Sequence, residues 1–363
     1  MTRVLFLTRY PIEGASSRYR VFQYLPHLKN LGVDTSVQSF MDTSMYRTSL
    51  QTGRTISKIW DVLHATTRRL WTLRRWRDYD IIYMQRELFP FGGLVIERWL
   101  KRRGAILFFD FDDALFIKKA SRYNRIATFF RSSKKIIDLF RIVDCVVAGN
   151  EWLAIEAKDA GALRTTCLEV AEDTGRIPMH TPHTNSSPVT IGWLGSPSTV
   201  KYLRLIEPVL QDIASNHPEL RWELMGGNDF KMDGVDWKLQ DWSLDGELEA
   251  LARFDIGLMP LPDEDWAKGK SGGKARTYMA AGIVPVVAAI GYNTQLIRNN
   301  ETGYLCSTPE HWQSNISKLI SDPELRQKIA NTAREEVNTR FAPTKMAKNM
   351  VDLFEQVLTD VRG

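Results

Sequence analysis

The chain has 363 residues, which is enough for two domains that each bury a core of their own. Its composition, 44% hydrophobic and 25% charged, is that of a globular protein and excludes a disordered or fibrous chain. The net charge of +5 is unevenly divided: residues 1–186 carry 29 Lys and Arg against 19 Asp and Glu, and residues 187–363 carry 19 against 24. We therefore expect the first half to meet an anionic partner, which is a membrane surface, a nucleic acid or a phosphorylated substrate.

The N-terminus and the cysteines indicate a cellular compartment. The apolar run from Val4 to Leu7 is too short for the core of a signal peptide, and no segment approaches 18 apolar residues. The cysteines at positions 145, 167 and 306 have neither metal-ligand nor CxxC spacing, which indicates buried thiols in a reducing compartment. We expect a cytosolic protein, or one that is peripheral on the inner face of a membrane.

The first half predicts alternating strands and helices. An apolar strand at 3–8 precedes a loop rich in Pro, Gly and Ser, and the helix that follows places four apolar residues on one face, namely Phe22, Leu25, Leu28 and Leu31. Further strands are predicted near 33–40, 80–84, 105–109 and 142–148. This alternation predicts parallel strands with right-handed crossovers and hence a Rossmann-like sheet.

The second half repeats the pattern after a segment rich in Pro and His. Strands are predicted at 189–194, 221–225, 254–259 and 284–289, and the last helix carries an apolar stripe from Met346 to Val361. We predict an α/β protein with two Rossmann-like domains that face a central cleft, because open α/β sheets bind ligands beyond the carboxyl ends of their strands. The predicted parts are an N-terminal acceptor domain (1–180), a linker (181–188), a C-terminal donor domain (189–342) and a helix that packs back on the first domain (343–363).

Two loops of the first domain contain side chains suited to a ligand. The loop after the first strand opens a helix and combines small residues with arginines, an arrangement that binds anions; its candidates are Gly14, Ser16, Arg18 and Arg20. The alternative is a helix start capped by a serine with solvent-facing arginines. After the strand at 105–109, the carboxylates of Asp110, Asp112 and Asp113 can act as bases, orient hydroxyls or hold a metal, whereas an Asx-turn or helix cap accounts for at least one of them.

Two loops of the second domain predict a site for a diphosphate. Gly195 and Ser196 follow its first strand and can bind phosphate oxygens. A loop rich in Lys and Gly then runs into a helix of small residues, so that N–H groups, a helix dipole and ammonium groups meet at Lys270, Gly272, Gly273 and Lys274. The spacing is not that of a P-loop, and the alternative is a solvated basic turn.

Two basic stretches carry the positive charge of the first half. Residues 54–78 contain seven Lys and Arg against two Asp, interspersed with three tryptophans, and residues 117–137 contain seven Lys and Arg and no acid. Lys and Arg beside Trp on an amphipathic helix suit an anionic bilayer surface. The alternative is a pair of solvated helix faces. Nucleic-acid binding is not expected, because no recognised module accompanies these stretches.

Taken together, these segments resemble the GT-B glycosyltransferases, and specifically the retaining enzymes of family 4 (group 1) that build bacterial polysaccharides. The resemblance covers nearly the full length and is carried by residues 6–11, 17–26, 85–87, 109–113, 191–198, 254–262 and 269–285. It implies transfer of a sugar, with retention, from a UDP- or GDP-sugar held by the second domain to a glycan or lipid-linked acceptor held by the first. It also implies that no metal is obligatory, because helix N-termini and basic side chains neutralise the departing diphosphate.

The resemblance also implies roles for individual residues. Catalytic roles fall on Asp112 and Lys274. Donor binding falls on Gly195, Ser196, Lys270, Gly272, Gly273, Lys274 and Thr277. Acceptor or cleft positions are Gly14, Ser16, Arg18, Arg20, Arg86, Glu87 and Asp113, and no metal ligand is expected.

The chain departs from the family pattern at five positions. The Glu-x7-Glu pair of many members falls on Gly269 and Thr277, so that the carboxylate that usually holds the donor ribose is missing and Thr277 is left as a weaker hydroxyl substitute. An Arg and a Lys common in the family fall on Trp193 and Ser198, and a histidine falls on Asp112. These changes suit a divergent subgroup. They also leave open the alternative of a non-catalytic GT-B protein that binds nucleotide-sugar or regulates an enzyme partner.

Overall fold

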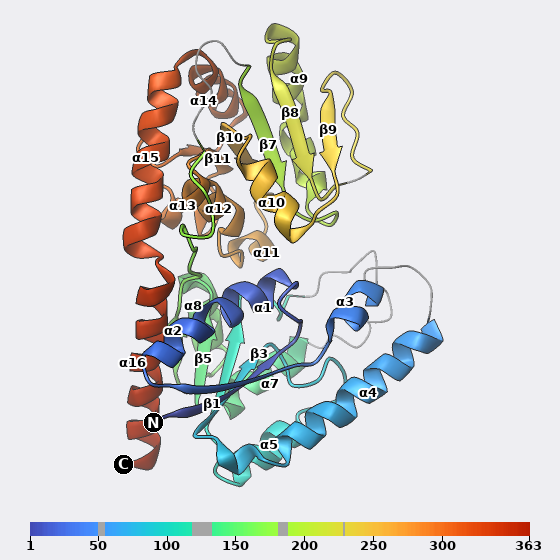
Figure 1. Ribbon diagram of the computed structural model, residues 1–363, viewed down its shortest axis with the longest axis vertical. Helices are drawn as coiled ribbons and strands as arrows, with labels where there is room; N and C mark the ends of the chain where they lie inside the picture. The colour runs from blue at the N-terminus through green and yellow to red at the C-terminus, as the bar shows by residue number, and fades with distance from the viewer. Residues whose placement is uncertain (50–54, 118–132, 181–187, 228) are drawn as a thin grey trace. The chain divides into compact units, whose positions relative to one another are not determined.

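The computed structural model describes residues 1–49, 55–117, 133–180, 188–227 and 229–363 (Figure 1). The chain forms two compact units: unit 1 is Met1–Ala171 with Pro343–Gly363, and unit 2 is Glu172–Ala342. The first boundary precedes the predicted one at 180, because Ile177 packs in the core of unit 2 and His180 Nε2 lies 3.1 Å from Asp255 Oδ1. Residues 181–187 of the predicted linker lie outside the described residues.

Unit 1 contains a six-stranded sheet with the order β2-β1-β3-β4-β5-β6. Every pair of neighbours is parallel. Because β3, β4 and β5 are buried along their whole length, they lack the alternation of a half-exposed strand, as is usual for a parallel sheet covered on both faces. The strands are β1 (Arg3–Thr8), β2 (Asp34–Ser39), β3 (Ile81–Gln85), β4 (Leu107–Phe111), β5 (Cys145–Ala148) and β6 (Thr165–Cys167).

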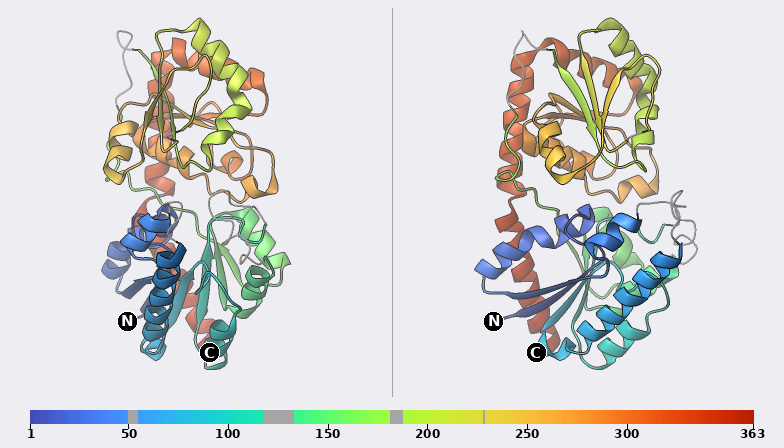
Figure 2. Two further views of the ribbon diagram at one scale, coloured as in Figure 1. Left: turned by 90° about the vertical axis from the view of Figure 1, so that its right-hand side faces the viewer. Right: turned by 45° about the vertical axis from the view of Figure 1, so that its right-hand side comes forward.

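Helices cover both faces of the sheet of unit 1 (Figure 2). On one face, Phe354 of the last helix contacts Phe6, Tyr83 and Phe108 of three neighbouring strands. On the other face, Phe140 packs against Phe109 and Phe111. The helices are α1 (Ala15–Arg20), η1 (Phe22–Tyr24), α2 (Leu25–Asn30), α3 (Thr43–Ser49), α4 (Thr55–Leu73), η2 (Trp76–Asp78), α5 (Val95–Arg102), α7 (Ser133–Ile142), α8 (Glu151–Asp159) and α16 (Pro343–Arg362).

Unit 2 repeats the design with the order β12-β11-β10-β7-β8-β9. Its strands, all parallel, are β7 (Thr190–Leu194), β8 (Arg221–Met225), β9 (Trp237–Gln240), β10 (Ile256–Met259), β11 (Val284–Ala288) and β12 (Tyr304–Cys306). Its helices are η3 (Val200–Ile206), α9 (Glu207–Asn216), α10 (Leu244–Leu251), α11 (Asp265–Lys268), α12 (Gly273–Ala281), α13 (Asn293–Leu296), α14 (Pro309–Ser321) and α15 (Pro323–Arg340). No helix within the described ranges is long and apolar enough to cross a membrane.

The strand orders confirm the predicted α/β class with two Rossmann-like sheets and define one position of interest in each. In unit 1, β1 lies between β2 and β3, and in unit 2, β7 lies between β8 and β10. In each sheet the chain first adds strands on one side of its first strand, β1 or β7, and then adds the remaining strands on the other side. Such a switch point opens a crevice beyond the carboxyl ends of the strands, where doubly wound sheets bind ligands.

Candidate functional site

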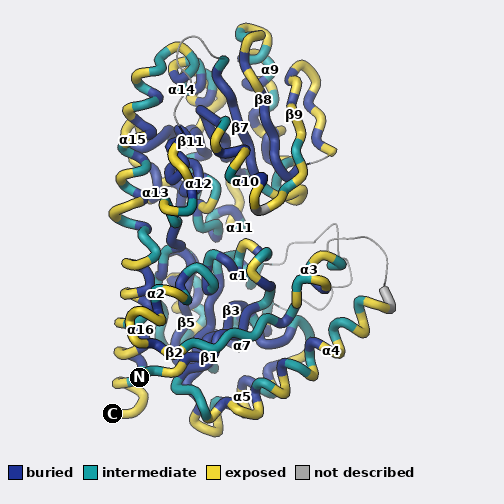
Figure 3. Tube along the Cα trace, viewed as in Figure 1, coloured by how far each residue is buried: buried dark blue, intermediate teal, exposed yellow. Residues whose placement is uncertain are grey.

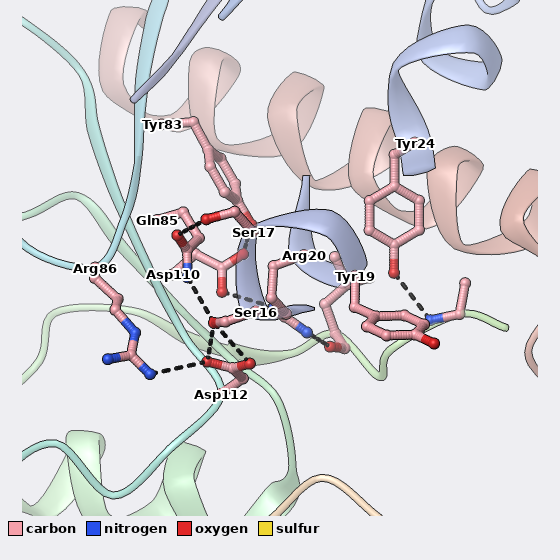
Figure 4. A network of polar contacts seen from close by, with 12 residues as sticks. Ser16, Ser17, Tyr19, Arg20, Tyr24, Tyr83, Gln85, Arg86, Asp110 and Asp112 are labelled. Atoms are coloured by element: carbon pink, nitrogen blue, oxygen red, sulfur yellow. Dashed lines mark hydrogen bonds and ion pairs between the residues drawn. The ribbon is translucent and has the colours of Figure 1, made fainter. Parts of the chain in front are cut away.

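The switch point of unit 1 joins the loops that follow β1, β3 and β4 (Figure 4). The hydroxyl of Ser16, at the start of α1, lies 2.7 and 2.9 Å from the two carboxylate oxygens of Asp112 and donates to that carboxylate. Gln85 Nε2, at the end of β3, donates to Ser16 Oγ at 2.9 Å. The predicted residues Ser16 and Asp112 therefore belong to one network, although 96 residues separate them in the chain.

Gln85 and Ser17, which are not among the predicted site residues, complete this network. Both are fully buried. Ser17 Oγ donates to Gln85 Oε1 at 2.8 Å, and the same oxygen accepts from the backbone N–H of Arg9 at 3.2 Å. The backbone N–H of Tyr10 donates to Ser17 Oγ at 3.1 Å. Gln85 could have been found from the sequence, because it ends an otherwise apolar strand. A buried amide at that position needs hydrogen-bond partners from neighbouring loops.

Arg86 has a strained backbone directly after β3. Its φ of 66° lies in the left-handed region, which a non-glycine residue adopts only where its surroundings enforce it. The guanidinium Nη2 lies 2.9 Å from Asp113 Oδ2 and 3.9 Å from Asp112 Oδ1. Burial by itself would lower the pKa of Arg86, and the nearby Tyr10, Asp113 and Asp112 raise it above its ordinary value. The arrangement fixes a permanent positive charge beside two carboxylates.

Arg20 has a different environment from the cleft position that the sequence predicts for it. Its side chain is fully buried, with Nε donating to Asp110 Oδ1 at 2.8 Å and Nη1 to the carbonyl of Leu168 at 2.5 Å. The Tyr83 hydroxyl donates to the other oxygen of Asp110. Burial raises the pKa of Asp110 to about 6, against the opposing effect of Arg20. Arg20 therefore holds α1 against β4 and is not exposed to a ligand.

Asp110 and Asp112, which a metal motif would place on one ion, have separate partners. Asp110 contacts Arg20 and Tyr83, and Asp112 contacts Ser16. Among the described residues, no group of three or more His, Cys, Asp or Glu is placed to hold a metal ion.

The remaining residues predicted for this loop shape it. A Cβ at Gly14 would lie 2.4 Å from Tyr10 Cβ, so only glycine fits there. Arg18 is buried, lies over the ring of Tyr19 at 5.1 Å and donates to the carbonyl of Glu13 at 3.4 Å. Glu87 is half-buried after Arg86.

The switch point of unit 2 brings Lys274 to the end of β7. The Lys274 ammonium lies 5.4 Å from the ring centroid of Trp193. A Cβ at Gly195 would lie 2.7 Å from Lys274 Cε and 2.5 Å from the Trp193 ring, so the backbone at Gly195 passes directly beside the lysine. Ser196 follows with an exposed side chain. The two predicted donor loops of unit 2 therefore meet.

The N-terminus of α12 adds backbone donors to this point. Its N-cap, Gly272, has φ +66°, a left-handed conformation that favours glycine. The next residue, Gly273, is exposed, and a Cβ there would have no heavy atom within 4 Å. Lys270 lies over the ring of Trp266 at 4.0 Å. A helix N-terminus with open space and two lysines is suited to an anion.

Thr277 lies one turn further along α12, and its partner was not anticipated from the sequence. It is buried, and its hydroxyl donates to Glu172 Oε2 at 2.8 Å. Position 277 itself carries no carboxylate, as the sequence shows, but Glu172 from another part of the chain places one beside it. Burial raises the pKa of Glu172 to about 7. No local motif marks Glu172, since it is the fold that brings the first residue of unit 2 to α12.

Comparison with known proteins finds a family match for one segment of unit 2. Residues 276–336 match the family model described as glycosyl transferases group 1. An 81-residue segment is 26% identical to spore coat protein SA of Bacillus subtilis, a match that covers 22% of this chain and 22% of the relative's own length.

Solved structures resemble the chain over almost its whole length. Sucrose-phosphate synthase from Thermosynechococcus elongatus matches with a TM-score of 0.70 and 14% identity, over 99% of this chain and all of that one. HepE from Anabaena, in complex with UDP and glucose, matches with a TM-score of 0.70 and 13% identity, over 98% of this chain and 100% of that one. The chain has the GT-B fold and carries a group 1 glycosyl transferase segment. The predicted GT-B fold and the resemblance to group 1 glycosyl transferases are confirmed, whereas family 4 and a retaining mechanism stay predictions.

The group 1 segment begins inside α12, two positions after Lys274. It therefore contains Thr277 and runs through β11 and β12 into α15. The predicted diphosphate residues from Lys270 to Lys274 lie immediately before it. The glycosyl transferase segment and the lysine-rich loop consequently share one helix.

Proposed function

We propose that this protein is a retaining glycosyltransferase that moves a sugar from a UDP- or GDP-sugar to a glycan or lipid-linked acceptor in bacterial surface polysaccharide synthesis. The observation that carries the proposal is the position of Lys274, on the helix in which the group 1 segment begins. Its side chain passes beside the backbone of Gly195, and its ammonium lies 5.4 Å from the ring centroid of Trp193. Structures of HepE, which shares the fold, contain UDP and UDP-glucose, and this supports a UDP-sugar as the first donor to test.

In this proposal unit 2 binds the donor diphosphate through two kinds of donor. The backbone N–H groups of Gly273 and Lys274 belong to the first turn of α12, where a helix presents N–H donors at its positive end. The ammonium groups of Lys270 and Lys274 add positive charge, which stabilises the diphosphate as it leaves. We therefore expect transfer to continue in a metal chelator.

Unit 1 is proposed to bind the acceptor through Asp112. This carboxylate is partly exposed and is fixed from one side by Ser16, so it can accept a hydrogen bond from an acceptor hydroxyl or take its proton. Arg86 and Asp113 fix the adjacent loop. The strained backbone of Arg86 is consistent with a site whose geometry is set in advance.

The alternative is a non-catalytic GT-B protein that binds a nucleotide-sugar or regulates a partner, and the substitutions at Gly269, Thr277, Trp193 and Ser198 favour it. The test is release of nucleoside diphosphate from a panel of UDP- and GDP-sugars in the presence of membrane extract. Turnover with one donor, and an α-linked product from an α-linked donor, supports the retaining enzyme. Saturable donor binding without turnover supports the alternative.

We further propose that the protein binds the cytoplasmic face of a membrane through α4 and α5. Figure 3 shows that α4 is exposed along one side. The described part of this surface presents large apolar side chains to solvent: Ile59, Trp60, Leu63, Leu70, Trp71, Val95 and Trp99. Three exposed arginines, Arg74, Arg75 and Arg77, follow directly after the end of α4. Trp beside Arg suits an anionic lipid surface. Most of the second predicted stretch, 118–132, lies outside the described residues.

A further inference from the structure

A cavity of about 490 Å³ lies in unit 1, at the end of the sheet opposite to the switch point. Its walls include Asp80 and Ile106, which directly precede β3 and β4, and Val361 and Arg362 at the end of α16 (Figure 1). The volume is within the range of about 300–1,000 Å³ that is usual for small-molecule sites. None of the residues predicted to bind the donor or the acceptor lines this cavity.

Two arginines and one aspartate line the cavity. Arg362 Nη2 donates to Asp80 Oδ1 at 2.8 Å, and the backbone N–H of Arg3 donates to Asp80 Oδ2 at 2.8 Å. Burial would raise the pKa of Asp80, but these hydrogen bonds lower it below its ordinary value, so the carboxylate is charged. The guanidinium of Arg77 lies 4.9 Å from the ring centroid of Trp76, and none of the ion pairs among the described residues involves it. The lining therefore has one net positive charge.

The cavity adjoins the exposed apolar surface of α4 and α5. Trp76 is 7% exposed and packs edge-to-face against Trp99 of α5, with 6.4 Å between the ring centroids. Gly104, also in the lining, follows α5, and a Cβ there would have no heavy atom within 4 Å, so the wall is open at this point. Arg102 and Arg103, directly before it, are exposed. Arginines and an exposed indole ring thus meet at one cavity.

These groups favour an occupant that has both a phosphate and an apolar part. A guanidinium binds phosphate oxygens in pairs, and the indole N–H of Trp76 and the hydroxyl of Tyr79 are further donors in the lining. Asp80 can accept a hydrogen bond from a hydroxyl of the same headgroup, whereas the net positive charge disfavours an ammonium group. The exposed tryptophans of α4 and α5 suit acyl chains. Inorganic phosphate would use the arginines alone.

We propose that this cavity binds the phosphodiester headgroup of an anionic phospholipid that carries hydroxyl groups, such as phosphatidylglycerol. Arg77 binds the phosphate, and Asp80 accepts from a headgroup hydroxyl. This inference rests on the proposed membrane binding of unit 1 and names the lipid that this surface recognises. It is independent of the donor chemistry at Lys274.

Vesicle binding with two lipids of equal charge tests the cavity. A basic surface without a headgroup site binds phosphatidylglycerol and phosphatidylserine equally at the same mole fraction, because it responds to surface charge alone. The wild-type protein should favour phosphatidylglycerol by roughly threefold or more, since phosphatidylserine carries an ammonium group. Arg77→Ala should reduce this ratio to about one. Arg74→Ala is the matched control: Arg74 is exposed, three residues away and outside the lining, so its loss should weaken binding to both lipids and leave the ratio unchanged.

A second pair of variants makes the test independent of Arg77. Val361→Glu adds a carboxylate to the lining, and Thr359→Glu adds one to the exposed side of the same helix. Only Val361→Glu should remove the preference for phosphatidylglycerol. Thermal unfolding verifies that each variant is folded.

The outcomes separate the headgroup site from membrane binding in general. Equal binding of both lipids by the wild-type protein, or a preference that survives both Arg77→Ala and Val361→Glu, overturns the headgroup assignment and leaves membrane binding of unit 1 standing. Absence of binding to either anionic vesicle overturns both. Displacement from phosphatidylglycerol vesicles by inorganic phosphate, beyond the effect of sodium chloride at the same ionic strength, would show that the cavity binds free phosphate and would overturn its assignment to a lipid.

Discussion

The two switch points have the same topology and opposite chemistry. In unit 1 the loops after β1, β3 and β4 are linked by carboxylates that bind arginines and a serine, with Asp112 at the centre. In unit 2 the loops after β7 and β10 present lysines over indole rings beside a glycine backbone, with Lys274 at the centre. One site offers acceptors for hydroxyl groups, and the other offers donors for an anion.

The net charge of each half predicts the opposite of what its site contains. The basic half has carboxylates at its switch point. The arginines there, Arg20 and Arg86, form ion pairs with Asp110 and Asp113 and so add no net positive charge to the site. Its excess positive charge lies in the two basic stretches, including the end of α4. The acidic half places lysines at its switch point. The net charge of a domain therefore predicts which partners its outer surface attracts. The chemistry of the site depends on the residues of the loops that form it.

The largest expected effect is that of Lys274→Ala in unit 2. Removing the ammonium takes away positive charge where the leaving diphosphate develops its own, so transfer should fall by roughly 100- to 1,000-fold. The measurement is the rate of nucleoside diphosphate release at saturating donor. Lys268→Ala is the matched control, because Lys268 precedes the same loop and its ammonium lies 2.8 Å from Asp265. Wild-type rates in Lys274→Ala would remove the diphosphate assignment.

Asp112→Asn tests the other side of the comparison. The amide keeps the shape, and Ser16 still finds an oxygen, but the charge and the basicity are lost, so transfer should fall by roughly 10- to 100-fold. Donor affinity should stay unchanged, since Asp112 belongs to unit 1. Asp138→Asn, at an exposed pair with Lys134, serves as the control. Weakened donor binding in Asp112→Asn would contradict the division of roles between the units.

A smaller effect concerns the buried carboxyl group of Glu172 in unit 2. The side chain of Glu172 accepts a hydrogen bond from the Thr277 hydroxyl, and burial raises its pKa to about 7. Because the folded state retains a proton that the unfolded state releases near its ordinary value of 4.5, stability is lost as pH rises from about 4.5 to about 7. The slope is about 1 kcal/mol per pH unit.

Urea unfolding between pH 5 and pH 7 measures this slope as the difference between the wild-type protein and Glu172→Gln. The difference isolates Glu172 from the other titrating groups, and Glu247→Gln provides the reference for a buried glutamate nearby. A difference that is constant with pH would show that Glu172 titrates as an exposed carboxyl does.

The sequence predicts the central strands well and misses three edge strands. β1, β3, β7 and β10 are near-continuous apolar runs, which is the pattern of a parallel strand buried on both faces. β6, β9 and β12 contain only three or four residues each and lie at or near the sheet edges, where one neighbour is enough and no apolar run is needed. Their short length, more than their composition, hides them from periodicity.

The candidate sites divide in the same way. Residues within a single loop, such as Lys270 and Lys274, are found because a helix N-terminus has a local signature. Pairs of residues that only the packing of the fold brings together cannot be found in this way. Glu172 and Thr277 are 105 positions apart in the sequence, and Ser17 and Gln85 are 68 apart. Arg20 shows the converse, since a charged residue in a functional loop is buried against Asp110 and its sequence context gives no sign of it.

The smallest expected effect concerns the surface of unit 1, where the basic half is expected to meet an anion. Trp60 and Trp71 are 69% and 71% exposed on one face of α4, so replacing both by Ser removes apolar contact without opening the core. Binding to vesicles that contain anionic phosphatidylglycerol should weaken roughly fivefold. Trp99→Ser, at 43% exposure on α5, should weaken it less. Equal binding of the wild-type protein to anionic and neutral vesicles would break the link between this half's charge and a membrane, while the contrast between Asp112 and Lys274 would stand, because neither residue lies on that face.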